Sequence, residues 1–129
     1  PYTTVGAMSY GRWSLVEVAS GFNSTSPIKA SANNTVAAAT SITVSLAAAP
    51  ASDSLSVAGF ESHLNASTAI DPRLNWTEIG EALGTVGDTG AIESQYKTAL
   101  NAELDASASV SATNRDWGGI HIELRNAGS

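Results

Sequence analysis

The chain has 129 residues and a mass of 13.1 kDa, which is enough for one domain with one core and too little for two. Ala, Ser and Thr supply 52 residues, yet 43% of the chain is hydrophobic, so disorder throughout is excluded. Twelve acidic and six scattered basic residues give a net charge of −6 with no cysteine, which excludes a nucleic-acid or anionic-membrane patch, disulfides and thiolate chemistry.

The first ten residues show no regular alternation of apolar and polar side chains. They also lack the basic region and the apolar run of an intact secretory signal. We therefore predict an extended arm over residues 1–10, followed by a single domain over residues 11–129. Residues 12–19 are a weak strand candidate, and residues 26–32 predict a short edge strand, because Pro27 cannot donate to a central ladder.

Further along the chain, four segments alternate with a period of two residues, the pattern of a half-buried strand. These segments are residues 42–46, 54–59, 106–113 and 120–125. Weaker candidates at residues 75–81 and 91–98 carry aromatic or β-branched side chains between turn formers. The only helix expected is one turn over residues 98–104. About eight short strands at this spacing predict an antiparallel β-sandwich.

The alternation also predicts which side chains share one core. The aliphatic members are Ile42, Val44, Leu46, Leu55, Val57, Val110, Ile120, Ile122 and Leu124. A shift of one residue in a strand would expose its whole set, so the direction of these side chains tests the prediction. Trp76 and Trp117 are expected in the same core, because a small sandwich needs large side chains to fill it.

No motif in the sequence places a nucleophile beside a base. The chain has two histidines, His63 at the end of a strand and His121 on the expected outward face of the last strand. A catalytic or metal site would need them to converge with carboxylates. We expect both to be surface or loop residues, with no hydrolase activity.

Pairs of carboxylates are the remaining candidates for chemistry. Glu78 with Glu81, or Glu93 with Glu123, could hydrolyse a glycoside if they were held a few ångströms apart. Twelve acidic residues on a small domain make such pairs inevitable by chance. No loop has the alternating acidic spacing of a calcium site. We therefore predict that the protein is not an enzyme and has no catalytic residue, no metal and no cofactor.

From about Thr40 to Gly128 the order of segments is distinctive. Two aliphatic strands flank an Ala-Pro turn, and a loop with Asp71-Pro72 precedes a strand that begins Asn75-Trp76-Thr77. A Gly-rich turn, a strand with Tyr96, a Ser/Ala strand and a final strand over residues 117–124 follow. This order resembles the jelly-roll β-sandwich modules of tailed-phage structural proteins and of secreted bacterial surface proteins. The resemblance covers about two thirds of the chain and implies a jelly-roll-like fold.

The resemblance implies a non-enzymatic virion structural protein on the virion surface: a capsid decoration or cement protein, or a tail-attached surface protein. Its partner would be the major capsid or tail protein of the same virion. We expect a homo-oligomer, with a trimer as the first guess. The side chains expected to contact another chain lie in or near the arm, and they are Tyr2, Val5, Met8, Tyr10 and Trp13.

The alternative is a carbohydrate-binding or adhesion module of a secreted or cell-surface protein, whose partner would be a host-surface glycan. Such modules bind sugars on exposed aromatic faces. The solvent exposure of Trp13, Trp76 and Trp117 therefore distinguishes the two functions.

Overall fold

The computed structural model describes residues 14–18, 20–65, 69–83, 89–98, 102–111 and 115–127. These residues form eight strands and no helix, so none of them belongs to a helix long and apolar enough to cross a membrane. The strands are β1 (Ile28–Ala39), β2 (Ser41–Ser45), β3 (Leu55–Asn65), β4 (Asp71–Pro72), β5 (Thr77–Ala82), β6 (Thr89–Lys97), β7 (Asp105–Ser109) and β8 (Arg115–Leu124). The predicted all-β class is confirmed, whereas the predicted arm over residues 1–10 lies outside the described residues.

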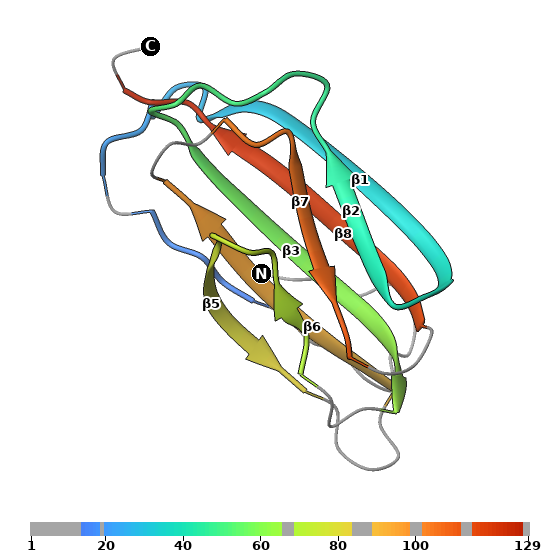
Figure 1. Cartoon of the computed structure of the whole chain (residues 1–129). Coiled ribbons are helices and arrows are strands. Elements are labelled where there is room, and N and C mark those ends of the chain that lie inside the picture. The colour runs from blue at the N-terminus through green and yellow to red at the C-terminus, as the bar shows by residue number, and fades with distance from the viewer. Residues whose placement is uncertain are drawn as a thin grey trace, which may run out of the picture.

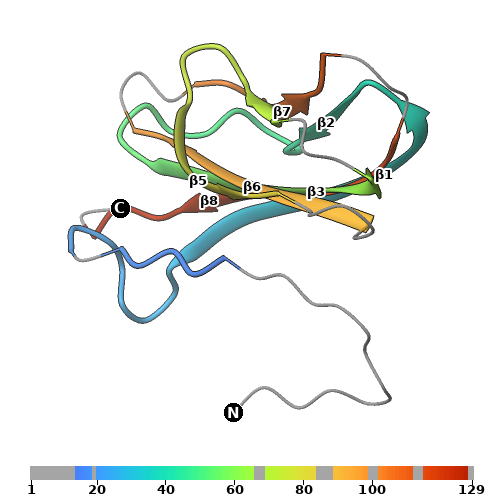
Figure 2. The ribbon, with the colours of Figure 1, turned by 90° about the horizontal axis from the view of Figure 1, so that it is seen from below.

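The strands form two antiparallel sheets that pack face to face. The larger sheet has the order β1-β8-β3-β6-β5, and the smaller has the order β2-β7-β4. Figures 1 and 2 show them as two layers. The chain crosses between the layers where β1 ends and β2 begins, and Val110 N donates to Thr40 O at this corner (2.9 Å). The architecture is the predicted antiparallel β-sandwich.

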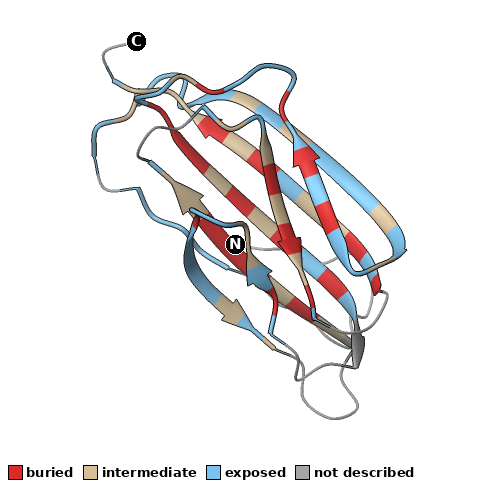
Figure 3. Ribbon diagram, in the orientation of Figure 1, coloured by how far each residue is buried: buried red, intermediate tan, exposed pale blue. Residues whose placement is uncertain are grey.

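The smaller sheet follows the predicted alternation. Ile42 and Val44 on β2 are buried, as are Ala106 and Ala108 on β7, and the residues between them are more exposed. Figure 3 shows the resulting bands along both strands. The predicted burial of Ile42, Val44, Leu46 and Val110 is confirmed, as is that of Trp76 and Trp117.

In the larger sheet, the side chains that face the core are those predicted to face solvent. Trp117 and His121 on β8 are buried, whereas Ile120 between them is 45% exposed. Register then sets the direction of the other side chains, because directly opposed residues share a face. Val57 pairs with Ile122, and Leu55 pairs with Leu124. The predicted inward direction is therefore wrong for Leu55, Val57, Ile120, Ile122 and Leu124, although Leu55 itself is buried.

Large side chains explain this phase. Phe60 on β3 and Trp117 on β8 belong to the core cluster between the sheets. Gly119 lets them pack there, because a Cβ atom on it would lie 2.8 Å from Phe60 Cδ1 and 2.9 Å from Val44 Cγ2. Since side chains alternate along a strand, the aliphatic residues on either side of His121 must face outward.

Several predicted boundaries differ from the structure. Residues 14–18 form no strand, and β1 extends well beyond the predicted segment, although its edge position is as predicted. Asp71–Pro72, read as a turn, forms the short strand β4 against β7. Of the predicted helical turn, residues 98 and 102–104 are described and are not helical.

The bulge near the end of β1 contains a strained residue. Ala38 has a φ of 52°, in the left-handed region, and its N–H donates to Asp116 Oδ1 (3.0 Å). Because a Cβ atom is unfavourable there, we expect Ala38→Gly to raise the free energy of unfolding by up to about 1 kcal/mol in urea denaturation. Ala37→Gly is the matched control and should lower it, since glycine only adds entropy to the unfolded chain there. Equal losses in both variants would contradict the argument.

Candidate functional site

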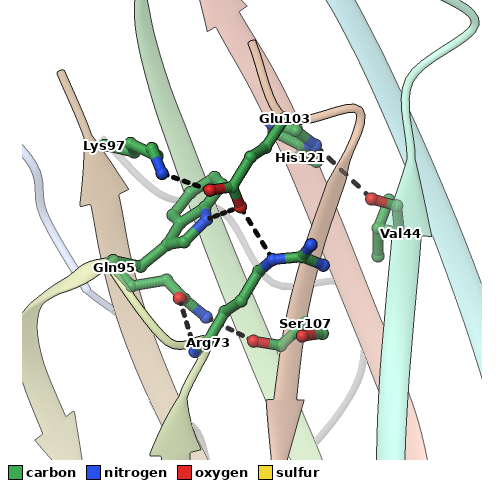
Figure 4. A network of polar contacts seen from close by, with 8 residues as sticks. Val44, Arg73, Gln95, Lys97, Glu103, Ser107 and His121 are labelled. Carbon is green, nitrogen blue, oxygen red and sulfur yellow. Dashed lines mark hydrogen bonds and ion pairs between the residues drawn. The ribbon is translucent and has the colours of Figure 1, made fainter. Parts of the chain in front are cut away.

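A polar network inside the sandwich joins the two sheets, as Figure 4 shows. Glu103, which precedes β7, lies at its centre. Its carboxylate accepts hydrogen bonds from Lys97 Nζ on β6 and from Trp76 Nε1 (3.1 Å), and it forms an ion pair with Arg73 Nε (2.8 Å). Three donors from two separate segments therefore share one carboxylate.

The side chain of Gln95 extends this network across the core. Gln95 is fully buried on β6. Its Oε1 accepts from Arg73 N (3.0 Å), and its Nε2 donates to Ser107 O on β7 (2.8 Å). The amide thus connects the larger sheet to the smaller one, and its hydrogen-bonding groups are used for structure.

His121 lies in the interior, so its predicted position on the outward face is wrong. It is fully buried, its ring packs edge-on against Trp76 with centroids 5.4 Å apart, and its Nδ1 lies 3.4 Å from Val44 O. Burial lowers its pKa more than the contact with Val44 raises it. A neutral imidazole with a lowered pKa is therefore part of the core at pH 7.

The two histidines do not converge. His63 is exposed and pairs with Asp116 in the register of β3 and β8, whereas His121 pairs with Ala58, five positions away along β3. Five is odd, so the two imidazoles lie on opposite faces of the sheet. No acid–base pair of histidines is formed.

Glu93 is the most perturbed carboxyl group of the interior. It is 1% exposed on β6, and burial, together with the charge of Glu78, raises its pKa to about 8. Its Oε2 lies 3.4 Å from Gln95 Nε2, and its Oε1 has no hydrogen-bond partner among the described residues. Glu93 is therefore protonated at pH 7.

The two nominated pairs of carboxylates differ in their surroundings. Glu81 accepts a hydrogen bond from the backbone N–H of Ile70, while Glu78 is exposed. Glu93 pairs with Phe60 and Glu123 with Ser56, so they are separated by about 13 Å along β3.

Glu123 is also engaged elsewhere. It accepts from Lys29 Nζ (3.0 Å) and Ala51 N (2.9 Å). Over the described ranges, no group of three His, Cys, Asp or Glu side chains could hold a metal.

The candidate binding surface is the outer face of the larger sheet, on the side away from the smaller sheet. It carries a set of large apolar side chains that the register places together, and these are Ile28, Leu55, Val57, Ile92, Tyr96, Ile120, Ile122 and Leu124. Of these, Ile28 is 52% and Ile120 45% exposed, Leu55 is buried, and the other five are half-buried. We call this set the outer face.

A shallow hollow of about 450 Å³ lies on the outer face. Gly59 and Gly118 contribute no side chains to it, while Ile92, Ile120 and Ser14 stand at its sides. Adjacent strands with glycine at outward positions therefore create a depression between apolar side chains.

The segment before β1 passes over the outer face. We call residues 14–18 and 20–27 the strap, and Figure 2 shows it on the side of the larger sheet opposite the smaller one. Ser94 Oγ donates to Ser14 Oγ (2.8 Å), which fixes one end of the strap to β6. Asn23 N donates to Arg125 O (3.0 Å), which fixes the other end beside β8. Leu15 in the strap is 79% exposed and adds apolar surface on this side.

The predicted contact residues Tyr2, Val5, Met8, Tyr10 and Trp13 all lie outside the described residues. Trp13 directly precedes Ser14 in the chain, and Ser14 lines the hollow.

The outer face does not follow from the alternation of residues alone, which predicted that the aliphatic side chains of β3 and β8 face the core. A usable signal was present in the bulky residues. Trp117 lies on the same face of β8 as His121, and Phe60 lies on the same face of β3 as Ala58. If aromatic residues are expected to fill the core, these two residues predict which face of each strand is buried. No family model, no curated protein and no solved structure matches this chain.

Proposed function

We propose that this protein is a non-enzymatic virion structural protein, a capsid decoration or tail-attached surface protein of a tailed phage, and that it docks to the major capsid or tail protein through the outer face. The observation that carries the proposal is the direction of the large aliphatic side chains. Ile120, Ile122 and Val57 face away from the core, while an ionisable group, Glu93, is buried. The resemblance in the order of segments supports the virion assignment.

A partner is the natural occupant of such a face. Contiguous exposed apolar surface on a soluble domain marks an interaction site, and burying it contributes roughly 25 cal/mol per Å². The central part of the outer face, around Ile120 and the two glycines of the hollow, also holds one acidic side chain, Glu61, which lies against Gly118. Large apolar side chains interspersed with a few polar groups are a common composition of a protein–protein interface.

The predicted contact residues of the arm would act on the same side. Trp13 is adjacent in sequence to Ser14, which is bonded to Ser94 on the outer face. The arm and the outer face would then form one attachment surface, and neither would need a catalytic group.

The described tryptophans do not favour the carbohydrate-binding alternative. Trp76 is 7% and Trp117 is 3% exposed, so neither offers a face on which a sugar ring could stack. Their Nε1 atoms donate to Glu103 and to Ala39 O, inside the protein. A glycan site would have to be built from other side chains.

The proposal is tested with Ile120→Glu, which introduces a charge at a position that is 45% exposed and so does not disturb the free protein. We expect the copy number of this variant on purified particles to fall at least about tenfold, because docking would bury the carboxylate. Leu74→Glu is the matched control, since Leu74 is 82% exposed in the turn between β4 and β5 and should not affect attachment.

A second variant, which lacks residues 1–10, tests the arm in the same assay. Loss of attachment with an unchanged unfolding curve is expected. If both Ile120→Glu and the truncated chain attach at the wild-type copy number, the outer face and the arm are not the docking elements and the proposal fails.

A further inference from the structure

β1 is the edge strand of the larger sheet, and its free edge is unusually regular. It pairs with β8 on one side, and within the described residues no strand pairs with its other side. Register shifts occur between Ile28 and Ala30 and again between Val36 and Ala39, and the run Ala30–Val36 between them pairs without interruption. Figure 1 shows β1 along the rim of the sheet. An edge of this kind exposes backbone N–H and C=O groups at alternate residues. Within the run, the N–H of Thr35 donates to Asn34 Oδ1 (2.9 Å), a local bond that a second strand would replace.

The devices that normally block an exposed edge are absent from this run. Ala30–Val36 contains no charged residue, no proline and no bulge. The opposite edge of the same sheet, β5, has all the usual protection: a bulge between Glu78 and Gly80 and two acidic side chains, Glu78 and Glu81. The edge of β2 is also partly occupied, because Asn34 Nδ2 donates to Thr43 O (2.8 Å).

The sequence of the run is complementary to itself. An antiparallel pairing centred on Asn33 would place Ser31 opposite Thr35 on the outer side and Ala30 opposite Val36 on the inner side, with no charges opposed. Hydroxyl and small apolar pairs of this kind stabilise adjacent strands. The nearest charged residue, Lys29, lies outside the run and is ion-paired with Glu123.

The self-complementary run selects a second copy as the occupant, and charge limits where that copy can bind. The chain has a net charge of −6, so two copies repel over much of their surface and can approach most closely along an uncharged edge. We infer that β1 is a contact between two copies of this chain, which pair antiparallel about a two-fold axis at Asn33 and join two larger sheets into one continuous sheet. This contact uses the backbone edge of the sheet, whereas docking to a particle uses its outer face, and the side chain of Asn33 lies where the two meet.

One short strand pair buries little side-chain area, so the isolated contact is weak. We expect a reversible dimer with a dissociation constant on the order of 10–100 µM. A two-fold contact predicts a dimer where the sequence suggested a trimer, and the measured mass distinguishes the two. Sedimentation equilibrium of the full chain should give a mass that rises with concentration toward twice 13.1 kDa.

Charge variants locate the contact. Asn33→Lys would oppose two ammonium groups across the axis and should weaken the dimer at least about tenfold. Thr77→Lys is the matched control, because Thr77 is also exposed on an edge strand, and it should leave the dimer unchanged. Both variants should unfold at the wild-type temperature, since both positions are exposed.

Because the chain has no cysteine, disulfide cross-linking through a single introduced cysteine gives a second, independent measurement. Opposed residues in antiparallel strands have Cβ atoms about 4.5–5.5 Å apart, close to what a disulfide needs. Asn33→Cys should therefore form a covalent dimer under mild oxidation at least about tenfold faster than Thr77→Cys, as followed on non-reducing gels. The inference is wrong if the chain stays monomeric up to about 1 mM or forms a trimer. It is also wrong if Asn33→Lys leaves the dimer unchanged, or if the two cysteine variants cross-link equally fast.

Discussion

Replacing Glu93 with glutamine should raise the free energy of unfolding by about 3 kcal/mol at pH 7 and by almost nothing at pH 4. Burial, with the charge of Glu78 as the next cause, raises the pKa of Glu93 in the folded protein to about 8, against 4.5 for the exposed group. Between these two values the unfolded chain releases a proton that the folded chain keeps. Wild-type stability therefore falls as the pH rises from about 4.5 to 8, and glutamine, which cannot ionise, removes this loss.

The measurement is urea denaturation of both proteins at pH 4 and pH 7. Comparing the two proteins at each pH cancels the titration of other groups, including His121, whose lowered pKa makes the protein less stable on acidification. Glu61→Gln on the exposed side of β3 is the control and should change stability little at either pH. An equal gain for Glu93→Gln at both pH values would show that packing and not proton binding is responsible.

The second large effect concerns Glu103, whose replacement by alanine should lower the free energy of unfolding by about 3 kcal/mol. The loss arises because Lys97, only 10% exposed, and Trp76 Nε1 would both lose their acceptor inside the protein. Arg73 would lose its ion pair as well. Burial opposes ionisation of Glu103, but the hydrogen bonds from Lys97 and Trp76 outweigh it and lower the pKa. This stabilisation should therefore disappear as the pH falls through that lowered value.

Two further variants separate charge from hydrogen bonding at Glu103. Glu103→Gln keeps one acceptor oxygen and should cost less than the alanine variant. Adding Lys97→Met to Glu103→Ala removes the buried unpaired ammonium group and should restore part of the stability. If Glu103→Ala unfolds at the wild-type urea concentration, the network in Figure 4 does not hold the two sheets together.

The sequence predicts the smaller sheet better than the larger one, and packing explains the difference. Ile42 and Val44 alternate with Thr43, and the strand has one covered side, so the apolar residues can only face it. Both faces of β8 carry large apolar or aromatic side chains, with Trp117 on one face and Ile120 and Ile122 on the other. Periodicity separates two such sets, but it does not say which set faces the second sheet.

The interior network could not be derived from local patterns. Glu103 and Arg73 are far apart in the sequence, in segments without alternation, and become partners only when β4 and β7 pair. His121 and Glu123 were predicted to face solvent because they alternate with aliphatic residues and have no hydrogen-bond partner nearby in the sequence. Their contacts come from Val44 and from Lys29 and Ala51, all in distant segments.

The way in which the strap is fastened determines how the domain would respond to tension. Phe22 pairs antiparallel with Asn126, and Ile28 with Leu124, so Gly21 and Ala127 lie at the same end of one ladder. A pulling force applied at Gly21 and Ala127 would load these hydrogen bonds one after another and open β1 from β8 like a zipper, instead of shearing many bonds at once. A load carried through the broad face of the sheet would be shared by several strands. The domain is thus mechanically suited to being held by its face and poorly suited to serving as a link in a chain under tension.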